Sequence, residues 1–170
     1  SVPVPDYVKR DFLTVNPYSR PGDELKTIRG VVIHYVGNPS TTAKANRDYF
    51  ESLSAGTDGT YASSHFVVGL EGEVIQCVPL TEIAYASNIR NEDTVAIEVG
   101  QFGPETYESV VRLTAWLCET FHLDPESDVI RHYDVTGKYC PKYYVENEDA
   151  WAALKADVSD QIAQDQAAAS

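Results

Sequence analysis

Cysteine is scarce in this sequence, and long apolar runs are missing. The three cysteines, Cys77, Cys118 and Cys140, are odd in number and far apart along the chain. They do not form a disulfide framework, so at least one thiol must be free, metal-bound or paired with another molecule. No stretch approaches the roughly 20 apolar residues of a membrane span, and residues 1–12 lack the apolar segment of a signal peptide. We therefore expect no membrane partner and no signal peptide in this chain.

Basic residues are also few. The 170 residues include 13 lysines and arginines against 26 aspartates and glutamates, which gives a formal net charge of -13. An acidic surface repels phosphate backbones and anionic lipids, so we do not expect nucleic acid to be a partner. Small molecules, neutral polymers and proteins remain. The content of 43% hydrophobic and 23% charged residues is that of an ordinary folded domain, and the length fits one domain.

The pattern of apolar residues predicts one mixed α/β domain. The continuous β-branched run at 31–36 is typical of a strand buried on both faces, and it ends at the turn residues 37–40. Further strands are predicted over 64–68, 73–78, 94–99 and 129–132, and helices over 41–53, 105–121 and 151–162. Residues 1–27 are expected to form an extended N-terminal arm, 133–145 a loop, and 164–170 a flexible tail.

Two histidines and a cysteine occupy positions where a sheet presents side chains to a site. His34 lies near the end of the most apolar strand, and His132 ends a second predicted strand, eight residues before Cys140. A lone histidine in such a strand is more often a hydrogen-bonded core residue. Two histidines and a thiolate can nevertheless share one Zn²⁺ and leave a fourth position for water, as in catalytic zinc sites. The triplet His34, His132 and Cys140 is therefore a candidate zinc site.

Glu98 and Lys138 are the candidates for proton transfer and charge stabilisation. Glu98 interrupts an apolar run, where a carboxylate beside a metal would suit a general base. On an edge strand the same residue would simply face solvent. Lys138 stands two residues before Cys140, so a loop that carries the thiol to a metal would carry this cation too. By default, a lysine in a polar loop is only solvated.

These residues lie within motifs that resemble a known family. The motifs are Val32-Ile33-His34, Ser64-His65-Phe66-Val67-Val68-Gly69 with Gly72 and Ile75-Gln76, Ala96-Ile97-Glu98, and Arg131-His132-Tyr133-Asp134 with Lys138-Tyr139-Cys140-Pro141. In order and spacing they resemble the zinc-dependent N-acetylmuramoyl-L-alanine amidases of type 2, which include the peptidoglycan recognition proteins and the amidase-type phage lysozymes. The resemblance runs from about Val31 to Trp151. Asn38-Pro39 and Asn46-Arg47-Asp48-Tyr49-Phe50 are similar to its Gram-positive bacterial branch.

The resemblance implies a fold and a role for each residue. It implies a central, mainly mixed β-sheet with helices on both sides. His34, His132 and Cys140 match the family's zinc ligands, Glu98 matches the proposed general base, and Lys138 matches the lysine that assists the oxyanion. In the implied reaction, Glu98 takes a proton from the attacking water and Lys138 helps to hold the developing negative charge.

The chain departs from the family at one position. Many relatives carry a tyrosine immediately before the histidine that matches His65, where this chain has Ser64. A tyrosine contribution would have to come from Tyr61 or Tyr35. His65 itself is expected to pack or to support the site rather than to bind metal, and Cys77 and Cys118 are expected to be buried small hydrophobes.

Three functions remain open at this stage. The first is an amidase that hydrolyses the bond between N-acetylmuramic acid and L-alanine of peptidoglycan. The second is a non-catalytic peptidoglycan-binding module, although such members of the family typically lack the thiol ligand that Cys140 matches. The third is a thiol enzyme in which Cys140 is the nucleophile and His132 its base. We expect a monomer that acts on peptidoglycan. It would be a secreted or wall-associated protein of a bacterium, or a lysis enzyme of a phage.

The negative charge makes a testable prediction about salt. Bacterial walls are often anionic themselves, so bulk electrostatics should not hold this domain on its substrate. Added salt should leave binding to purified peptidoglycan unchanged or improve it, as measured by cosedimentation over a sodium chloride series. Strong inhibition of binding by moderate salt would contradict this expectation.

Overall fold

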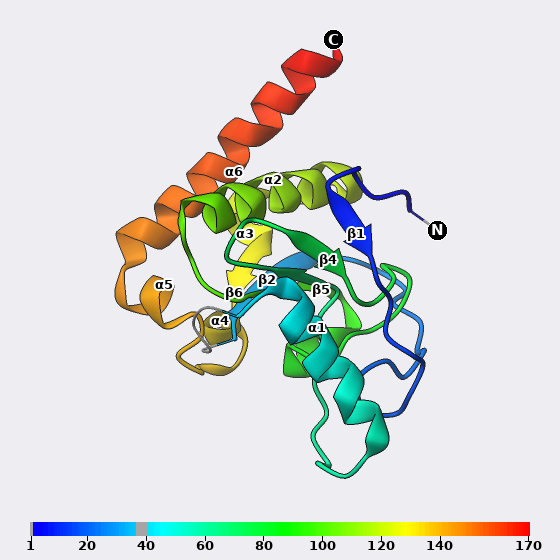
Figure 1. The fold of residues 1–170 in the computed structure, drawn as a ribbon. Coiled ribbons are helices and arrows are strands. Elements are labelled where there is room, and N and C mark those ends of the chain that lie inside the picture. Colours follow the sequence, from blue (N-terminus) through cyan, green and yellow to red (C-terminus); the bar gives the residue numbers. More distant parts are fainter. Residues whose placement is uncertain (1, 37–40) are drawn as a thin grey trace.

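A six-stranded mixed sheet forms the centre of the molecule (Figure 1). The computed structural model describes residues 2–36 and 41–170, so the turn predicted at 37–40, with Asn38-Pro39, lies outside the described residues. The strands are β1 (Val8–Arg10), β2 (Gly30–Tyr35), β3 (Phe66–Val68), β4 (Val74–Gln76), β5 (Thr94–Val99) and β6 (Val129–Arg131). Their order across the sheet is β1-β4-β3-β5-β2-β6. The prediction of a mainly mixed sheet in a single α/β domain is confirmed.

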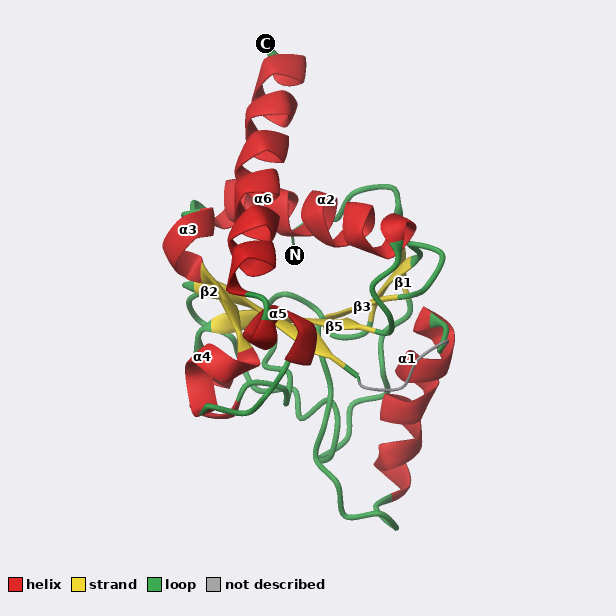
Figure 2. Ribbon diagram, turned by 90° about the vertical axis from the view of Figure 1, so that its left-hand side faces the viewer, coloured by secondary structure: helices red, strands yellow, loops and turns green. Residues whose placement is uncertain are grey.

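Helices cover both faces of this sheet (Figure 2). They are α1 (Ala43–Ser52), α2 (Pro104–Phe121), α3 (Pro125–Asp128), α4 (His132–Thr136), α5 (Lys142–Glu146) and α6 (Glu148–Ala169), with 3₁₀ turns η1 (Leu53–Ala55) and η2 (Asn88–Glu92). The α2 and α6 helices lie on one side, and α1 and α4 lie on the other. Thr42 caps α1, because its side chain accepts a hydrogen bond from the Ala45 amide. Across the described residues, no helix is long and apolar enough to span a membrane.

The alternation of strand residues decides what each face of the sheet carries. Val31 and Ile33 of β2 and Val95, Ile97 and Val99 of β5 belong to the apolar core that contains α2 and α6. Successive side chains of a strand point to opposite faces. The residues between them, including His34 and Glu98, therefore face the other side, away from α2. The parallel register pairs His34 with Glu98 directly.

The β2, β3, β5 and β6 strands run in the same direction, because β5 pairs in parallel with β2 and β3, and β2 pairs in parallel with β6. Their carboxyl ends therefore meet at one edge of the sheet, which is where open α/β sheets bind ligands. Only the β3–β4 hairpin is antiparallel among the pairings of the described strands, and it turns at Gly69–Gly72, between the strands predicted over 64–68 and 73–78.

Three segments differ from the sequence-based expectation. The N-terminal arm is not merely extended, because its residues 8–10 form β1 and pair with β4 at the sheet edge. The predicted loop 133–145 contains α4 and α5, and the strand expected to reach His132 ends at Arg131. The predicted tail 164–170 is helical through Ala169. Elements of one turn or three residues are too short to show a periodicity, and the end of α6 lacks apolar residues that would mark it.

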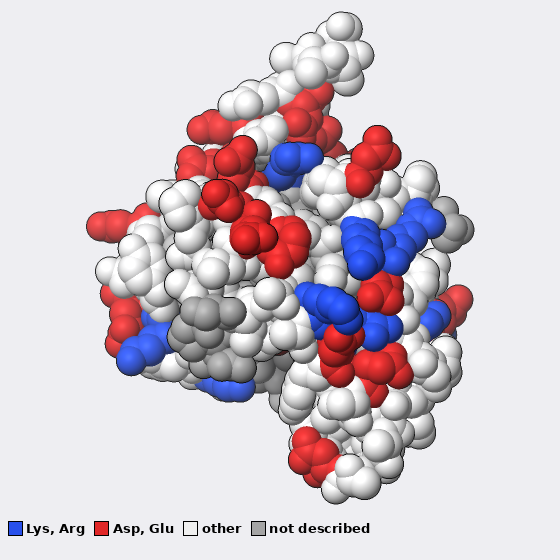
Figure 3. Space-filling view, in the orientation of Figure 1, with Lys and Arg blue, Asp and Glu red and all other residues white. Residues whose placement is uncertain are grey.

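Acidic side chains gather over α6 in the face drawn in Figure 3. The helix contains Glu148, Asp149, Asp157, Asp160 and Asp165 in its sequence. It packs on the α2 side of the sheet, whereas His34 and Glu98 face the opposite side. The sheet thus separates these α6 carboxylates from His34 and Glu98.

Arg131 connects four elements at the end of β6. Its guanidinium donates to both carboxylate oxygens of Asp134 at 2.8 and 3.0 Å, to the Tyr144 carbonyl at 2.7 Å and to Glu148 at 3.0 Å. The same group lies 5.4 Å from the centre of the Trp151 ring. The side chain is 7% exposed. These contacts link β6 to α4, α5 and α6, and they anchor the residue immediately before His132.

Replacement of this arginine should destabilise the domain. Arg131→Ala leaves Asp134 and the Tyr144 carbonyl without their charged donor, at an expected cost of about 2–4 kcal/mol in the free energy of unfolding. Arg131→Lys should recover only part of that loss, because an ammonium cannot reproduce the fork-shaped contact. Urea unfolding followed by circular dichroism measures both. Lys44→Ala, which removes an exposed ion pair with Asp48, is the control and should change stability by less than about 0.5 kcal/mol. An equal loss of stability in Arg131→Ala and Lys44→Ala would contradict the role of Arg131.

Candidate metal centre

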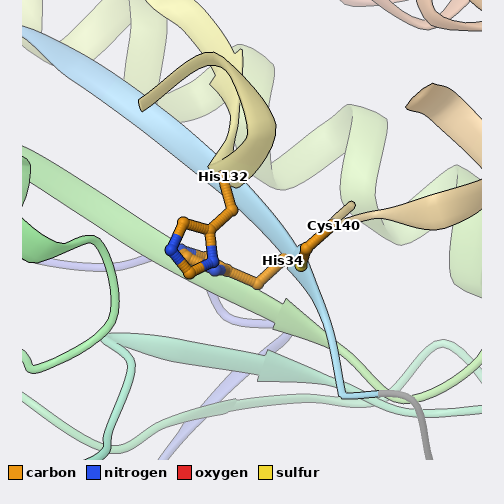
Figure 4. A group of neighbouring side chains, drawn as sticks. All are labelled: His34, His132 and Cys140. Atoms are coloured by element: carbon orange, nitrogen blue, oxygen red, sulfur yellow. The ribbon is translucent and has the colours of Figure 1, made fainter. Parts of the chain in front are cut away.

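Three predicted ligands converge at the carboxyl edge of the sheet. One ligand atom from each of His34, His132 and Cys140 lies within 4.8 Å of the others (Figure 4). His34 comes from β2, His132 begins α4, and Cys140 precedes α5. The two imidazole rings meet edge to face with their centroids 4.7 Å apart. Two neutral nitrogens and a sulfur at this spacing are a donor set that suits Zn²⁺, and three protein ligands leave one of its usual four coordination positions for water or substrate.

The chain between His132 and Cys140 folds back on itself to bring the thiol into the cluster. The Tyr133 amide donates to the Cys140 carbonyl at 3.0 Å, and Gly137 ends α4 with a φ of 82°. Positive φ at this position favours glycine. The Cys140 sulfur then accepts a hydrogen bond from the Tyr35 amide at 3.4 Å, directly beside His34. This loop explains the eight-residue separation that the sequence shows.

Each histidine has a hydrogen-bond partner on its Nε2 atom. The Nε2 of His34 lies 2.9 Å from the Ser87 hydroxyl oxygen, and the Nε2 of His132 lies 2.9 Å from Oδ1 of Asn88. The sequence interpretation missed both partners. The segment that carries them has neither periodicity nor a motif, and the contacts join residues that are 53 and 44 positions apart.

Burial keeps the imidazoles neutral. His34 is 2% exposed, and its burial lowers its pKa to about 3, with smaller contributions from His132 and Lys138. Burial also lowers the pKa of His132, assisted by the charge of Lys138. Neutral imidazoles offer a lone pair to a metal without first losing a proton. The burial of the Cys140 thiol raises its pKa, which favours the protonated form in the absence of a metal.

Glu98 lies next to this cluster and has an unusual environment. Its carboxylate oxygen Oε2 is shielded from solvent, and no hydrogen-bond partner for it exists among the described residues. Desolvation raises the pKa of Glu98 to about 7, and the nearby charge of Lys138 only partly opposes this. The solvent-facing edge-strand alternative is therefore wrong, because β5 lies between β3 and β2 in the sheet.

Lys138 is exposed. Its charge lowers the pKa values of His34, His132, Glu98 and Cys140, so it acts on every member of the group. A cation in this position makes the cluster more favourable for negative charge.

Two hollows flank the cluster. One, of about 360 Å³, is lined by Tyr35, Phe102, Pro141, Lys142, Tyr143 and Glu146. The other, of about 220 Å³, is lined by Tyr61, Tyr85, Ala86, Asn88 and Asn91. Tyr35 thus lines the first hollow, and Tyr85 lines the second. The Tyr133 ring instead lies against Tyr139 and the Arg131 guanidinium.

His65 and Ser64 have structural contacts. The Nε2 of His65 donates to the Glu82 carbonyl at 2.7 Å, and its Nδ1 accepts from the Ala96 amide at 3.0 Å, so both ring nitrogens are engaged. The Ser64 hydroxyl donates to the Phe66 carbonyl at 2.8 Å. Cys77 and Cys118 are buried, and burial raises the pKa of each thiol to about 12. They are inert core residues, as expected.

Solved structures share this fold. The catalytic domain of XlyA superposes with a TM-score of 0.74 at 21% identity and covers 89% of this chain and 98% of that chain. Staphylococcus aureus hydrolase AmiA, solved in complex with its ligand, gives a TM-score of 0.70 at 15% identity over 95% of this chain and 85% of that chain. These similarities concern the fold.

Sequence comparison identifies the family. N-acetylmuramoyl-L-alanine amidase BlyA of Bacillus subtilis (strain 168) is 32% identical over 169 residues, which are 85% of this chain and 44% of BlyA. CwlL of Bacillus licheniformis, also named an N-acetylmuramoyl-L-alanine amidase, is 29% identical over 89% of this chain and 46% of its own. The chain thus spans less than half the length of these relatives. The family model described as N-acetylmuramoyl-L-alanine amidase matches residues 24–143, which include the three converging side chains, and the chain belongs to this family.

Proposed function

We propose that this domain is a zinc-dependent N-acetylmuramoyl-L-alanine amidase that cleaves the amide bond between N-acetylmuramic acid and L-alanine in peptidoglycan. The observation that carries the proposal is the convergence of His34, His132 and Cys140 to within 4.8 Å at the carboxyl edge of the sheet. Family membership and the fold support it. We further propose that the domain works as a monomer on the bacterial cell wall, either as a bacterial wall enzyme or as a phage lysis enzyme.

His34, His132 and Cys140 would hold the Zn²⁺. When bound, the ion would polarise the scissile carbonyl and lower the pKa of a water molecule. Because Nε2 of each histidine is already hydrogen-bonded, Nδ1 is the atom left for the metal. A thiolate ligand reduces the positive charge of the centre. Neighbouring residues must therefore contribute more of the stabilisation.

Glu98 is the proposed general base. Its raised pKa of about 7 lies near neutral pH, where a carboxylate can both accept a proton and return it. It would take the proton of the attacking water and deliver one to the leaving alanine nitrogen. The direct register between Glu98 and His34 supports this role, because it places the carboxylate on the ligand-bearing face of the sheet.

Lys138 is the proposed partner of the developing oxyanion. Its exposure and its charge effect on the whole group support this role. The mobility of a long side chain allows the ammonium to approach the substrate carbonyl once the substrate is bound.

The structure disfavours the thiol-nucleophile alternative. Cys140 is 7% exposed, and its pKa is raised. A nucleophilic cysteine needs a lowered pKa and an exposed sulfur. The intact set of Cys140, Glu98 and Lys138 also supports hydrolysis over a binding-only module.

A digestion of purified peptidoglycan tests the proposed reaction. The domain should release new L-alanine amino groups without new reducing sugars, and a chelator should abolish the release until Zn²⁺ is restored. Cys140→Ser should reduce turnover by at least about 100-fold while keeping peptidoglycan binding. Cys118→Ser is the matched thiol control and should stay active. New reducing ends would indicate a glycosidase, and full activity after complete removal of zinc would rule out the metal mechanism.

The buried carboxylate of Glu98 predicts a pH-dependent stability in the metal-free protein. Its pKa is raised from 4.5 to about 7 on folding, so the folded state binds this proton more tightly than the unfolded state. The resulting stabilisation is present below pH 4.5 and is lost as the pH rises through about 7. Glu98→Gln stays neutral, so its stability relative to the wild type should increase by about 2 kcal/mol between about pH 5 and pH 8.

Urea unfolding in the presence of a chelator measures this difference. Glu71→Gln changes an exposed glutamate and is the control, for which no such pH dependence is expected. A difference for Glu98→Gln that stays constant with pH would show that Glu98 ionises normally.

A further inference from the structure

Two consecutive residues hydrogen-bond to the two converging histidines. Ser87 meets Nε2 of His34, and Asn88 meets Nε2 of His132, each at 2.9 Å. The histidines come from β2 and α4, whereas both partners come from the single segment between β4 and β5. One short turn therefore controls the orientation of two rings that arrive from different parts of the chain.

The Asn88 contact selects one tautomer of His132, and the Ser87 contact is compatible with the same tautomer of His34. The Oδ1 atom of Asn88 can only accept, so Nε2 of His132 carries the proton and Nδ1 keeps its lone pair. The Ser87 hydroxyl can accept from Nε2 of His34 in the same way, which leaves the lone pair on Nδ1 of that ring too. Metal-bound histidines generally donate their other ring N–H to such a partner, which fixes the ring and raises its basicity.

The turn that carries these partners is itself held in place. The side-chain oxygen of Asn91 accepts from the amides of Ala86 and Ser87 at 3.1 and 2.6 Å. The Arg90 amide donates to the Ser87 carbonyl at 3.0 Å. The Asn88 backbone has a φ of 55°, in the left-handed region that asparagine tolerates better than most residues. Asn91 thus fixes the two peptide groups that flank Ala86.

We propose that Ser87 and Asn88, presented by the turn that Asn91 holds, are positioning residues that prepare His34 and His132 to bind zinc through Nδ1. This inference rests on the proposed zinc site. It assigns to the 86–91 segment a contribution to metal affinity in addition to that of the three ligands.

The two contacts should differ in strength because their surroundings differ. Ser87 is 1% exposed and His34 is 2% exposed, so water has little access to this hydrogen bond. Removal of the hydroxyl would leave a buried N–H without a partner. Asn88 is exposed, and water can replace its Oδ1 atom beside His132. Ser87 should therefore matter more than Asn88.

Zinc affinity measured by competition with a chromophoric chelator tests the inference independently of catalysis. Ser87→Ala should raise the dissociation constant for Zn²⁺ by about 10–100-fold, and Asn88→Gly by less than about 10-fold. Glycine is chosen because it accepts the positive φ of this position. Asn88→Asp keeps the accepting oxygen and should retain wild-type affinity or exceed it. Cobalt-substituted Ser87→Ala should also show altered visible absorption bands, which report the geometry of the metal ligands.

Asn91 provides a second pair of variants. Asn91→Ala removes the acceptor of the two amides and should weaken Zn²⁺ binding about as much as Ser87→Ala, since the turn that presents the hydroxyl is loosened. Asn91→Asp keeps an oxygen at the same place and should restore the affinity. Rescue by the aspartate variant distinguishes positioning from a general loss of folding.

Ser19→Ala is the control, because Ser19 is a fully buried serine that bonds to Asn16 in the N-terminal segment. It should leave zinc affinity unchanged. If the wild type binds Zn²⁺ tightly and Ser87→Ala binds it equally well, the positioning role is wrong while the proposed amidase stands. If the wild type does not bind Zn²⁺, the proposed zinc site fails and the inference fails with it. Urea unfolding of the metal-free variants identifies any variant that has lost its fold. In that case the Zn²⁺ affinities of Asn88→Asp and Asn91→Asp decide whether the positioning role holds.

Discussion

The parallel pairing of β2 with both β5 and β6 is the constraint on which the candidate metal centre depends. It places His34 in direct register with Glu98 and brings the end of β6, where His132 begins α4, beside the end of β2. Because the strands run in one direction, their carboxyl ends share an edge. Alternation along β2 and β5 then sends the polar side chains to one face and the β-branched side chains to the α2 core. A shift of one residue in this register would bury the polar groups in that core.

The same packing sets the electrostatics of the site. Burial keeps both imidazoles neutral and brings the pKa of Glu98 to about 7, whereas the exposed Lys138 favours negative charge nearby. These effects suit a reaction that needs neutral metal ligands, a base near neutrality and a cation for the oxyanion. Arg131 contributes to the position of His132, since its contacts with Asp134, Tyr144 and Glu148 fix the backbone next to that histidine.

The acidic surface and the site are separate features of the molecule. The acidic residues of α6 lie on the α2 side of the sheet, and the centre faces the other side, between two hollows that contain tyrosines. Aromatic side chains offer both an apolar face and a polar edge, which suits sugar rings and stem peptides better than a strongly charged surface would. The carboxylates of α6 therefore lie on the face of the sheet opposite to the candidate metal centre.

Local sequence determined the strands β2 to β6, the long helices and the identity of the candidate ligands. The β-branched run of β2 and the helical spacing in α2 are local patterns, and the block from His132 to Pro141 carries its own spacing. Tertiary structure decided the rest. Neither β1 nor the short helices α4 and α5 is long enough to show a period, and the role of Arg131 emerges only when β6, α5 and α6 meet. Ser87 and Asn88 reach the histidines across 53 and 44 residues, a contact that no local pattern encodes. The sequence identifies the candidate ligands, whereas the orientation of their side chains depends on hydrogen bonds that form only after the chain has folded.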